Sequence, residues 1–192
     1  MSEPFVHPSA VVDEGVTLGA GVSIWHFSHV MTGASIGPGS MIAQGCFVGK
    51  NVTIGAGVRI QNNVSVFDGV TIEDEVFVGP SAVFTNVKRP RAFVRRGPPF
   101  ERILVRRGAT IGANATVLPG VELGRYAFVA AGALVRENVP AFALVAGVPA
   151  RPLGWVSRRG ERLTFEAGVA CCAESGERYR LTPSGVELDG SG

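Results

Sequence analysis

Residues 30–60 read VMTGASIGPGSMIAQGCFVGKNVTIGAGVRI. Within them an aliphatic residue recurs at every sixth position: Val30, Ile36, Ile42, Val48, Ile54 and Ile60. An α-helix would repeat its apolar face at about 3.6 residues and a half-exposed strand at two, so a period of six fits neither. It fits a short strand followed by a turn, with the aliphatic side chain pointing inward and glycine accepting the bend.

The same spacing extends to both sides of this stretch. Fourteen consecutive sixth positions, from Val6 to Phe84, are aliphatic or aromatic, and the pattern resumes from Val105 to Val135. A small or β-branched residue follows four places after most of them. Three such units make a coil of about 18 residues, which predicts an all-β fold, a left-handed parallel β-helix of hexapeptide repeats. A β-sandwich with irregular strands would not keep this register.

One interruption and one end divide the chain. From Phe84 to Val105 is 21 residues instead of six, so about 15 residues, 87–102, should leave the prism as a protruding loop. After Val139 the repeat dissolves into a segment whose prolines should end strand pairing. We therefore expect a β-helix domain over residues 1–155 and a small polar C-terminal extension over 156–192. The loop and its flank hold one acid, Glu101, and these bases: Lys88, Arg89, Arg91, Arg95, Arg96, Arg102, Arg106 and Arg107.

Bulk properties restrict the class of protein. A formal net charge of +2 argues against nucleic acid as the general partner, and the basic loop has only Phe93 and Phe100 as stacking residues. No stretch approaches the roughly 18 apolar residues of a membrane span, and the first residues do not resemble a signal peptide, so we expect a cytoplasmic protein without membrane contact. Three cysteines, two of them adjacent, do not indicate a disulfide framework.

The repeat and the segment 146–151 (AGVPAR) resemble the hexapeptide-repeat acyltransferases over residues 5–155. Narrower similarity lies in residues 24–29 (IWHFSH), 60–70 (IQNNVSVFDGV), 79–87 (GPSAVFTNV), 90–91 and 108–116. These stretches are similar to nucleotide-amino-sugar N-acetyltransferases, above all to enzymes acting on the 3-amino group of UDP-linked 2-acetamido-3-amino-2,3-dideoxy-glucuronic acid. The resemblance implies acetyl-CoA as co-substrate, a homotrimer with active sites between subunits, and a role in bacterial surface polysaccharide (O-antigen) synthesis.

Residues 18 apart stack in columns, so Asn86 should lie above Asp68, which should lie above Lys50. Asn86 immediately precedes the basic loop, and loops on rigid scaffolds often carry function. We predict that Asn86 orients the substrate amine by a hydrogen bond, with Asp68 as a second catalytic candidate. An asparagine that only caps a turn is the alternative.

The three histidines, His7, His26 and His29, lie in the first two coils. At roughly 5 Å of rise per coil they should be too far from Asn86 to accept the amine proton. The resemblance agrees, because the similar enzymes lack a histidine base beside the amine. We expect the departing CoA thiolate, with a thiol pKa of about 8.5, to accept that proton.

Several polar residues are candidates for binding the sugar nucleotide. Asn62 should stack above Gln44 and His26, and amides gather around it at a turn. An asparagine ladder that caps turns is the alternative. In the loop, Arg91 and Arg95 are candidates for the uronate carboxylate or the phosphates, and a solvated basic loop is the alternative. The full set of predicted substrate-binding residues is Gln61, Asn62, Asn63, His26, His29, Arg91 and Arg95.

For CoA, the resemblance implies a groove between two prisms in the later coils. The residues it implies there are Gly112, Ala130, Ala131, Gly132, Arg136 and Arg151. In the extension, residues 159–163 and 175–179 look like two zinc-knuckle turns, but of the four ligand positions (Val156, Arg159, Cys172 and Ser175) only one is a cysteine. We therefore expect a degenerate zinc-ribbon-like extension without metal.

Three other functions fit parts of the sequence. N-acetylation of a dTDP-3-amino-deoxyhexose would leave the loop arginines without a carboxylate to bind. A γ-type carbonic anhydrase would need zinc on interface histidines, and the histidines here are few and close to the N-terminus. A non-catalytic scaffold would show no acetyl-CoA-dependent thiol release.

Overall fold

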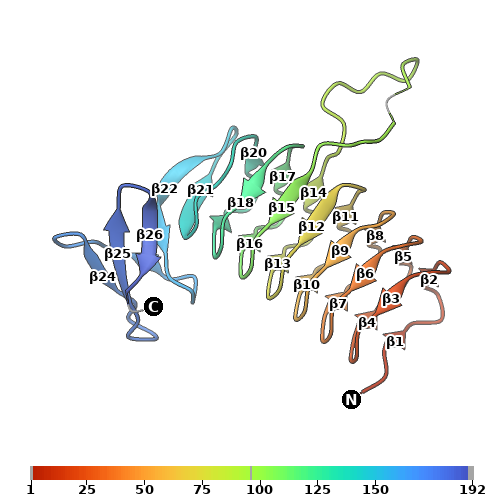
Figure 1. The fold of residues 1–192 in the computed structure, drawn as a ribbon, viewed down its shortest axis with the longest axis horizontal. Coiled ribbons are helices and arrows are strands. Elements are labelled where there is room, and N and C mark those ends of the chain that lie inside the picture. The colour runs from red at the N-terminus through yellow and green to blue at the C-terminus, as the bar shows by residue number, and fades with distance from the viewer. Residues whose placement is uncertain (1, 96, 190–192) are drawn as a thin grey trace.

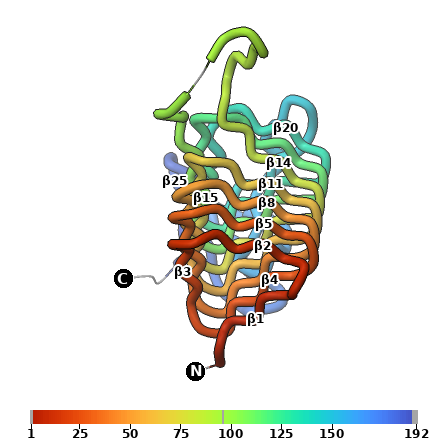
Figure 2. The backbone as a smooth tube through the Cα atoms, turned by 90° about the vertical axis from the view of Figure 1, so that its right-hand side faces the viewer, coloured from red at the N-terminus to blue at the C-terminus, as the bar shows by residue number. Residues whose placement is uncertain are grey.

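The computed structural model describes residues 2–95 and 97–189 and forms a left-handed parallel β-helix, as the six-residue repeat predicts (Figure 1). Very short strands alternate with tight turns around a triangular prism. Figure 2 looks along the stacked coils, with the long loop projecting from one corner. No helix in the described part of the chain is long and apolar enough to cross a membrane. Arg96 lies outside the described residues.

Three parallel walls make up the prism. Wall A contains β1 (Phe5–Val6), β4 (Ser23–Ile24), β7 (Met41–Ile42), β10 (Arg59–Ile60), β13 (Phe77–Val78), β16 (Thr110–Ile111), β19 (Phe128–Val129) and β21 (Ala143–Ala146). Wall B contains β2 (Val11–Val12), β5 (His29–Val30), β8 (Phe47–Val48), β11 (Ser65–Val66), β14 (Val83–Phe84), β17 (Thr116–Val117) and β20 (Leu134–Val135). Wall C contains β3 (Thr17–Leu18), β6 (Ser35–Ile36), β9 (Thr53–Ile54), β12 (Val70–Ile72), β15 (Ile103–Val105) and β18 (Glu122–Leu123).

The walls meet at three columns of turns, which we name by the walls they join. In one coil the AB corner is residues 61–63, the BC corner is 67–69 and the CA corner is 73–75. Strands pair with a register of 18 residues, as in Ser23 with Met41. Across the long loop Phe84 pairs with Val117, so the loop is an insertion that leaves the register of the coils unchanged.

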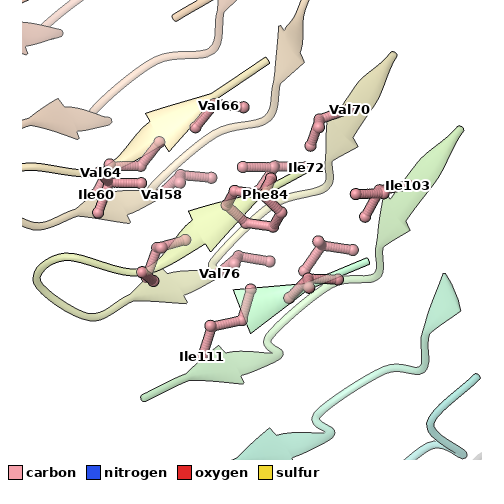
Figure 3. Packing of buried hydrophobic residues seen from close by; sticks show 14 of the residues in the cluster. Val58, Ile60, Val64, Val66, Val70, Ile72, Val76, Phe84, Ile103 and Ile111 are labelled. Atoms are coloured by element: carbon pink, nitrogen blue, oxygen red, sulfur yellow. The ribbon is translucent and has the colours of Figure 1, made fainter. Parts of the chain in front are cut away.

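The core is a continuous column of aliphatic side chains, because each coil points its sixth-position residue into the prism (Figure 3). Ile60, Val78 and Ile111 succeed one another up wall A, and each is fully buried. The small residue four places later fills the corner: Val64, Ala82 and Ala115 are also buried. Each coil thus excludes water only when another coil lies above or below it.

Strand pairing continues beyond Val139, contrary to the expectation that prolines would end it. Strand β21 pairs in parallel with β19, and then antiparallel with β22 (Arg151–Val156), which pairs with β23 (Arg162–Leu163). Pro152 lies opposite Val145 where the register shifts, at a bulge, which is a position that tolerates a residue without an amide hydrogen. Wall A therefore extends past the prism into the C-terminal extension.

The C-terminal extension, expected to be small, polar and zinc-ribbon-like, has a sheet and a core of its own. Strands β24 (Val169–Cys171), β25 (Arg178–Thr182) and β26 (Gly185–Leu188) form an antiparallel sheet. A second core forms beneath it around the fully buried Tyr179, and its buried members are Phe142, Leu163, Ala170, Cys172, Tyr179 and Val186. Trp155 packs against both cores and so connects the extension to the prism.

Two turns of the extension face each other, as in a zinc ribbon, and Cys172 contacts one expected position, Ser175, together with two residues outside the expected set. Ser157 Oγ lies 3.3 Å from Cys172 Sγ, and Glu161 Oε2 lies 3.4 Å from it. Hydrogen bonds from the Ser157 and Ser175 hydroxyls lower the pKa of the Cys172 thiol. Within residues 2–95 and 97–189, no group of three His, Cys, Asp or Glu side chains is placed to hold a metal ion.

Candidate active site

Asn86 stands where the BC corner opens into the loop. Thr85 is the last residue before the loop to pair with the coil above, its amide donating to Val117 O at 3.0 Å. The chain returns to the prism at Ile103, whose amide donates to Gly69 O at 3.1 Å. Between these points the loop borders an open hollow of about 460 Å³ lined by Asn86, Val87, Lys88, Arg89, Arg95, Gly97, Pro99, Phe100 and Glu101.

This hollow combines a neutral amide with an excess of positive charge. Lys88, Arg89 and Arg95 line it against one carboxylate, Glu101. The structure thus brings together two of the predicted residues, Asn86 and Arg95. Such a lining favours an anionic ligand such as a phosphate or a carboxylate.

Arg91 does not line this hollow. It lies against a separate depression with Pro90, Ala92 and Val94, and its Nη1 donates to Pro90 O at 2.9 Å. Of the two loop arginines singled out from the sequence, the geometry therefore favours Arg95.

Asp68 stacks below Asn86, as the register predicts, but its side chain turns toward the coil beneath. Its Oδ1 accepts a hydrogen bond from the Lys50 amide at 2.8 Å. Asp74, in the next corner, does the same for the Ala56 amide at 2.8 Å. Because an aspartate outside the site has the same geometry, we assign Asp68 a turn-capping role, so that of the two residues Asn86 is the one that lines the hollow.

The AB corner carries a second hollow, of about 380 Å³, nearer the N-terminus. It brings together three of the predicted residues, His26, Gln61 and Asn62, with Trp25, Met41, Ala43 and Gln44. The His26 ring stacks on His7, with ring centroids 3.5 Å apart. The mixture of flat rings and amides is suited to a planar polar group such as a nucleobase.

His29 and Asn63 lie outside that lining. His29 Nε2 is 2.9 Å from Asp13 Oδ1, and this hydrogen bond is the main reason that the pKa of Asp13 is below its usual range. Asn63 has a φ of 60°, and its side chain covers Gly45 of the coil below. Asn51 has the same geometry over Gly33, which favours the turn-capping interpretation for Asn63.

The AB corner of the later coils consists of small residues. Two of its backbone amides donate no hydrogen bond to a carbonyl of the described residues. The amides of Gly112, Ala130 and Gly132 already donate to Val129 O, Val145 O and Ala113 O. Among the described residues, those of Ala113 and Ala131 donate to no backbone carbonyl. They are one coil apart, about 5 Å, which suits a ligand with successive amide carbonyls. The repeat did not point to Ala113, because alanine at a turn carries no signal of its own.

A physical reason exists for the glycines at this corner. A Cβ on Gly112 would lie 2.4 Å from the Ala131 nitrogen, so the coil above requires glycine there. At Gly132 no atom lies within 4 Å of a Cβ, but its φ of +69° favours glycine.

Arg136 and Arg151 lie at the end of the prism, on the BC side. Both approach one carboxylate: Arg136 Nε lies 3.3 Å and Arg151 Nη1 lies 3.7 Å from Glu137 Oε1. They therefore form one cluster, while the amides of Ala113 and Ala131 belong to a different corner of the same chain.

Comparison with known proteins agrees with this architecture. The family described as bacterial transferase hexapeptide (six repeats) matches residues 15–50, and the hexapeptide repeat of succinyl-transferase matches residues 107–136. A solved hexapeptide-repeat-containing acetyltransferase from Vibrio cholerae O1 biovar eltor, complexed with acetyl coenzyme A, is 32% identical. The match covers 65% of this chain and 72% of that one, with a TM-score of 0.57. The chain belongs to the hexapeptide-repeat transferase family.

Curated relatives within the hexapeptide-repeat transferases match a shorter segment. A dTDP-3-amino-3,6-dideoxy-α-D-galactopyranose 3-N-acetyltransferase from Aneurinibacillus thermoaerophilus is 41% identical over 81 residues, 42% of each chain. A 2,3,4,5-tetrahydropyridine-2,6-dicarboxylate N-acetyltransferase from Staphylococcus aureus is 43% identical over 76 residues, 40% of this chain and 29% of the relative. These matches cover less than half the length of either relative.

Proposed function

We propose that this chain is an acetyl-CoA-dependent N-acetyltransferase that acts on a nucleotide-linked amino sugar. The observation that carries the proposal is the hollow at the loop root, where Asn86 stands beside Arg95 on a hexapeptide-repeat prism. A named relative acetylates the amine of a dTDP-sugar, and a solved one was crystallised with acetyl coenzyme A. An enzyme for such a substrate needs a group that holds a neutral amine and cations that hold phosphates.

The proposed reaction needs no histidine beside the amine. Asn86 Oδ1 accepts a hydrogen bond from the sugar amine and aligns its lone pair with the thioester carbon. The nitrogen–carbon bond forms, and a backbone amide stabilises the oxyanion of the tetrahedral intermediate. The carbon–sulfur bond then breaks, and the CoA thiolate accepts the proton that nitrogen releases. His26 is at a different corner, in an earlier coil, which is consistent with this route.

We propose that acetyl-CoA runs along the AB corner of the later coils. The free amides of Ala113 and Ala131 would face the carbonyls of the pantetheine arm, beside Gly112, Ala130 and Gly132. Arg136 and Arg151 would meet phosphates, but they lie at the other corner. No single chain brings these groups together.

This separation supports the proposed homotrimer. In one prism the width of wall B separates Asn86 and Arg95 from Ala131. Several outward residues of that wall are apolar, among them Val11 and Val83. A neighbouring copy packed there would bring its own corner to Asn86 and complete the site. The expected cytoplasmic location stays a prediction.

For the sugar, we propose UDP-linked 2-acetamido-3-amino-2,3-dideoxy-glucuronic acid, made for bacterial surface polysaccharide. The excess of cations in the loop hollow supports it, because this substrate adds a carboxylate to its phosphates. The second candidate is a dTDP-3-amino-3,6-dideoxyhexose, which the Aneurinibacillus relative favours.

A thiol-release assay with acetyl-CoA and a panel of UDP- and dTDP-linked 3-amino sugars tests both candidates. We expect the fastest release with the UDP-uronate. Arg95→Gln should raise KM for that substrate by about tenfold, the effect of losing one charged hydrogen bond. An unchanged KM would favour the dTDP-deoxyhexose, and no sugar-dependent release from any member of the panel would disprove the proposed activity.

A further inference from the structure

Two oppositely charged side chains face each other across the root of the long loop. Lys88, on the outgoing limb, places its Nζ 2.7 Å from Glu101 Oε2 on the returning limb. Between them, the described residues 89–95 and 97–100 belong to no strand of the three walls. The pair joins the two limbs directly at the loop root. Its position alone distinguishes it from the other surface ion pairs of the prism.

The returning limb rests on two coils at once. A Cβ on Gly120, in the coil above, would lie 2.7 Å from Glu101 Oε2 and 3.9 Å from Lys88 Nζ. A Cβ on Gly69, in the coil below, would lie 3.4 Å from Phe100 Cβ. The ion pair and Phe100 therefore lie close against Gly120 and Gly69, whose positive φ values of +84° and +93° favour glycine.

Glu101 is the one carboxylate in the described lining of a hollow that otherwise carries cations. By engaging Lys88, it leaves Arg95 to meet an anionic ligand. We propose that the Lys88–Glu101 ion pair clasps the loop root and thereby holds Asn86 and Arg95 in one hollow, with Glu101 as a positioning residue. The clasp itself is a property of the fold, and its effect on catalysis rests on the proposed acetyltransferase activity.

Limited proteolysis can measure how often the Lys88–Glu101 pair lets the loop open, and it does not depend on enzymatic activity. Phe93, at the far end of the loop, is 87% exposed, and chymotrypsin cuts after phenylalanine. The cleavage rate of the Phe93–Val94 bond, followed by mass spectrometry, reports how often the loop opens. Glu101→Gln should raise that rate roughly two- to fivefold, the range that an exposed ion pair supports. High salt should raise the wild-type rate toward the same value.

Two further variants serve as a rescue and a control: one exchanges the two charges of the pair, and the other breaks an ion pair away from the loop. The double variant Lys88→Glu/Glu101→Lys restores the attraction and should return the cleavage rate to that of the wild type. Glu75→Gln is the matched control, because it breaks another exposed pair, Arg107 with Glu75 at 2.9 Å, away from the loop. A Glu101→Gln rate equal to that of the control, or a double variant as open as Glu101→Gln, would overturn the proposal.

The second readout is steady-state kinetics with the sugar that the panel selects. Glu101→Gln should raise KM by the same two- to fivefold factor with kcat within about twofold, since fewer molecules have the loop in its binding position. Charge exchange should reverse the change. If cleavage follows the prediction while KM stays fixed, the positioning role is wrong. If the wild type transfers no acetyl group but cleavage follows the prediction, the clasp stands and the proposed function fails.

Discussion

Asn86 and Asp68 show that two polar residues of one column can have different surroundings. Both are polar, stand 18 residues apart and follow a buried strand. Asp68 bonds to the amide of the coil beneath, like Asp74 one corner later. Asn86 has a loop above it and a hollow beside it. The distinction comes from neighbours that stacking supplies, and residue type alone does not reveal it.

Asn86→Ala should lower kcat/KM by about 100-fold with little change in unfolding temperature, because the proposed hydrogen bond to the amine is lost while the side chain makes no hydrogen bond within the described residues. Steady-state thiol release measures the first quantity and calorimetry the second.

Asn51→Ala is the matched control for that variant. Asn51 belongs to the same column of turns and covers Gly33, with a φ of 55°. Its loss should cost about 1 kcal/mol of stability and leave kcat/KM within a factor of two. Near-normal activity in Asn86→Ala would disprove its assigned role.

Among the elements, the first two coils are tied by Asp13. Its two carboxylate oxygens meet the His29 ring at 2.9 Å and the Thr32 amide at 3.2 Å. The hydrogen bond with His29 is the largest cause of the lowered pKa of Asp13. These coils lie at the open end of the prism, where Val6 is 37% exposed.

The lowered pKa of Asp13 predicts a pH dependence of stability. A carboxyl whose pKa is lower in the folded state stabilises that state fully above its unfolded pKa, near 4, and the contribution disappears as pH falls through the folded value. Wild type should therefore unfold at a higher temperature than Asp13→Asn at pH 6, and the difference should vanish by about pH 2. A difference that is constant over this range would contradict the assignment.

The sequence predicts the repeated strands of the prism well, and it predicts the strands that follow the prism poorly. Every sixth-position residue from Ile24 to Phe84 is buried, because an inward aliphatic side chain is a local requirement that recurs in each coil. The strands after Val139 were missed, and the ribbon-like extension was predicted without its core around Tyr179, since antiparallel hairpins of unequal length leave no period in the sequence. Burial raises the pKa of Tyr179 to about 12. Its hydroxyl donates a hydrogen bond to Glu177 and accepts one from the Arg158 amide. The spacing of residues in the sequence does not indicate these contacts.

The site was predicted in part for the same reason. The 18-residue register predicted that Asn86 stacks over Asp68, and the gap in the repeat predicted the protruding loop. Lys88 and Glu101 were visible in the sequence only as charges. Their pairing depends on where the returning limb lies, close to Gly69 and Gly120 in two different coils, and the sequence does not indicate that position.

For the whole molecule, the proposed trimer predicts a mass in sedimentation equilibrium of three times the 20.1 kDa chain. The expected species should persist at micromolar concentration, because apolar side chains of walls A and B are exposed in one copy. A monomer mass at that concentration would rule out an active site shared between copies. The variant Val83→Glu, on wall B, should dissociate the trimer and abolish activity together.

The unbroken pairing of Phe84 with Val117 has an evolutionary and practical consequence. Since the coils continue as though the inserted residues were absent, selection can lengthen, shorten or replace that segment without altering any strand partner. Substrate preference can then change independently of folding. A segment exchanged between paralogous prisms at Thr85 and Ile103 should leave the coils intact, and under the proposed function it should transfer the acceptor preference with it.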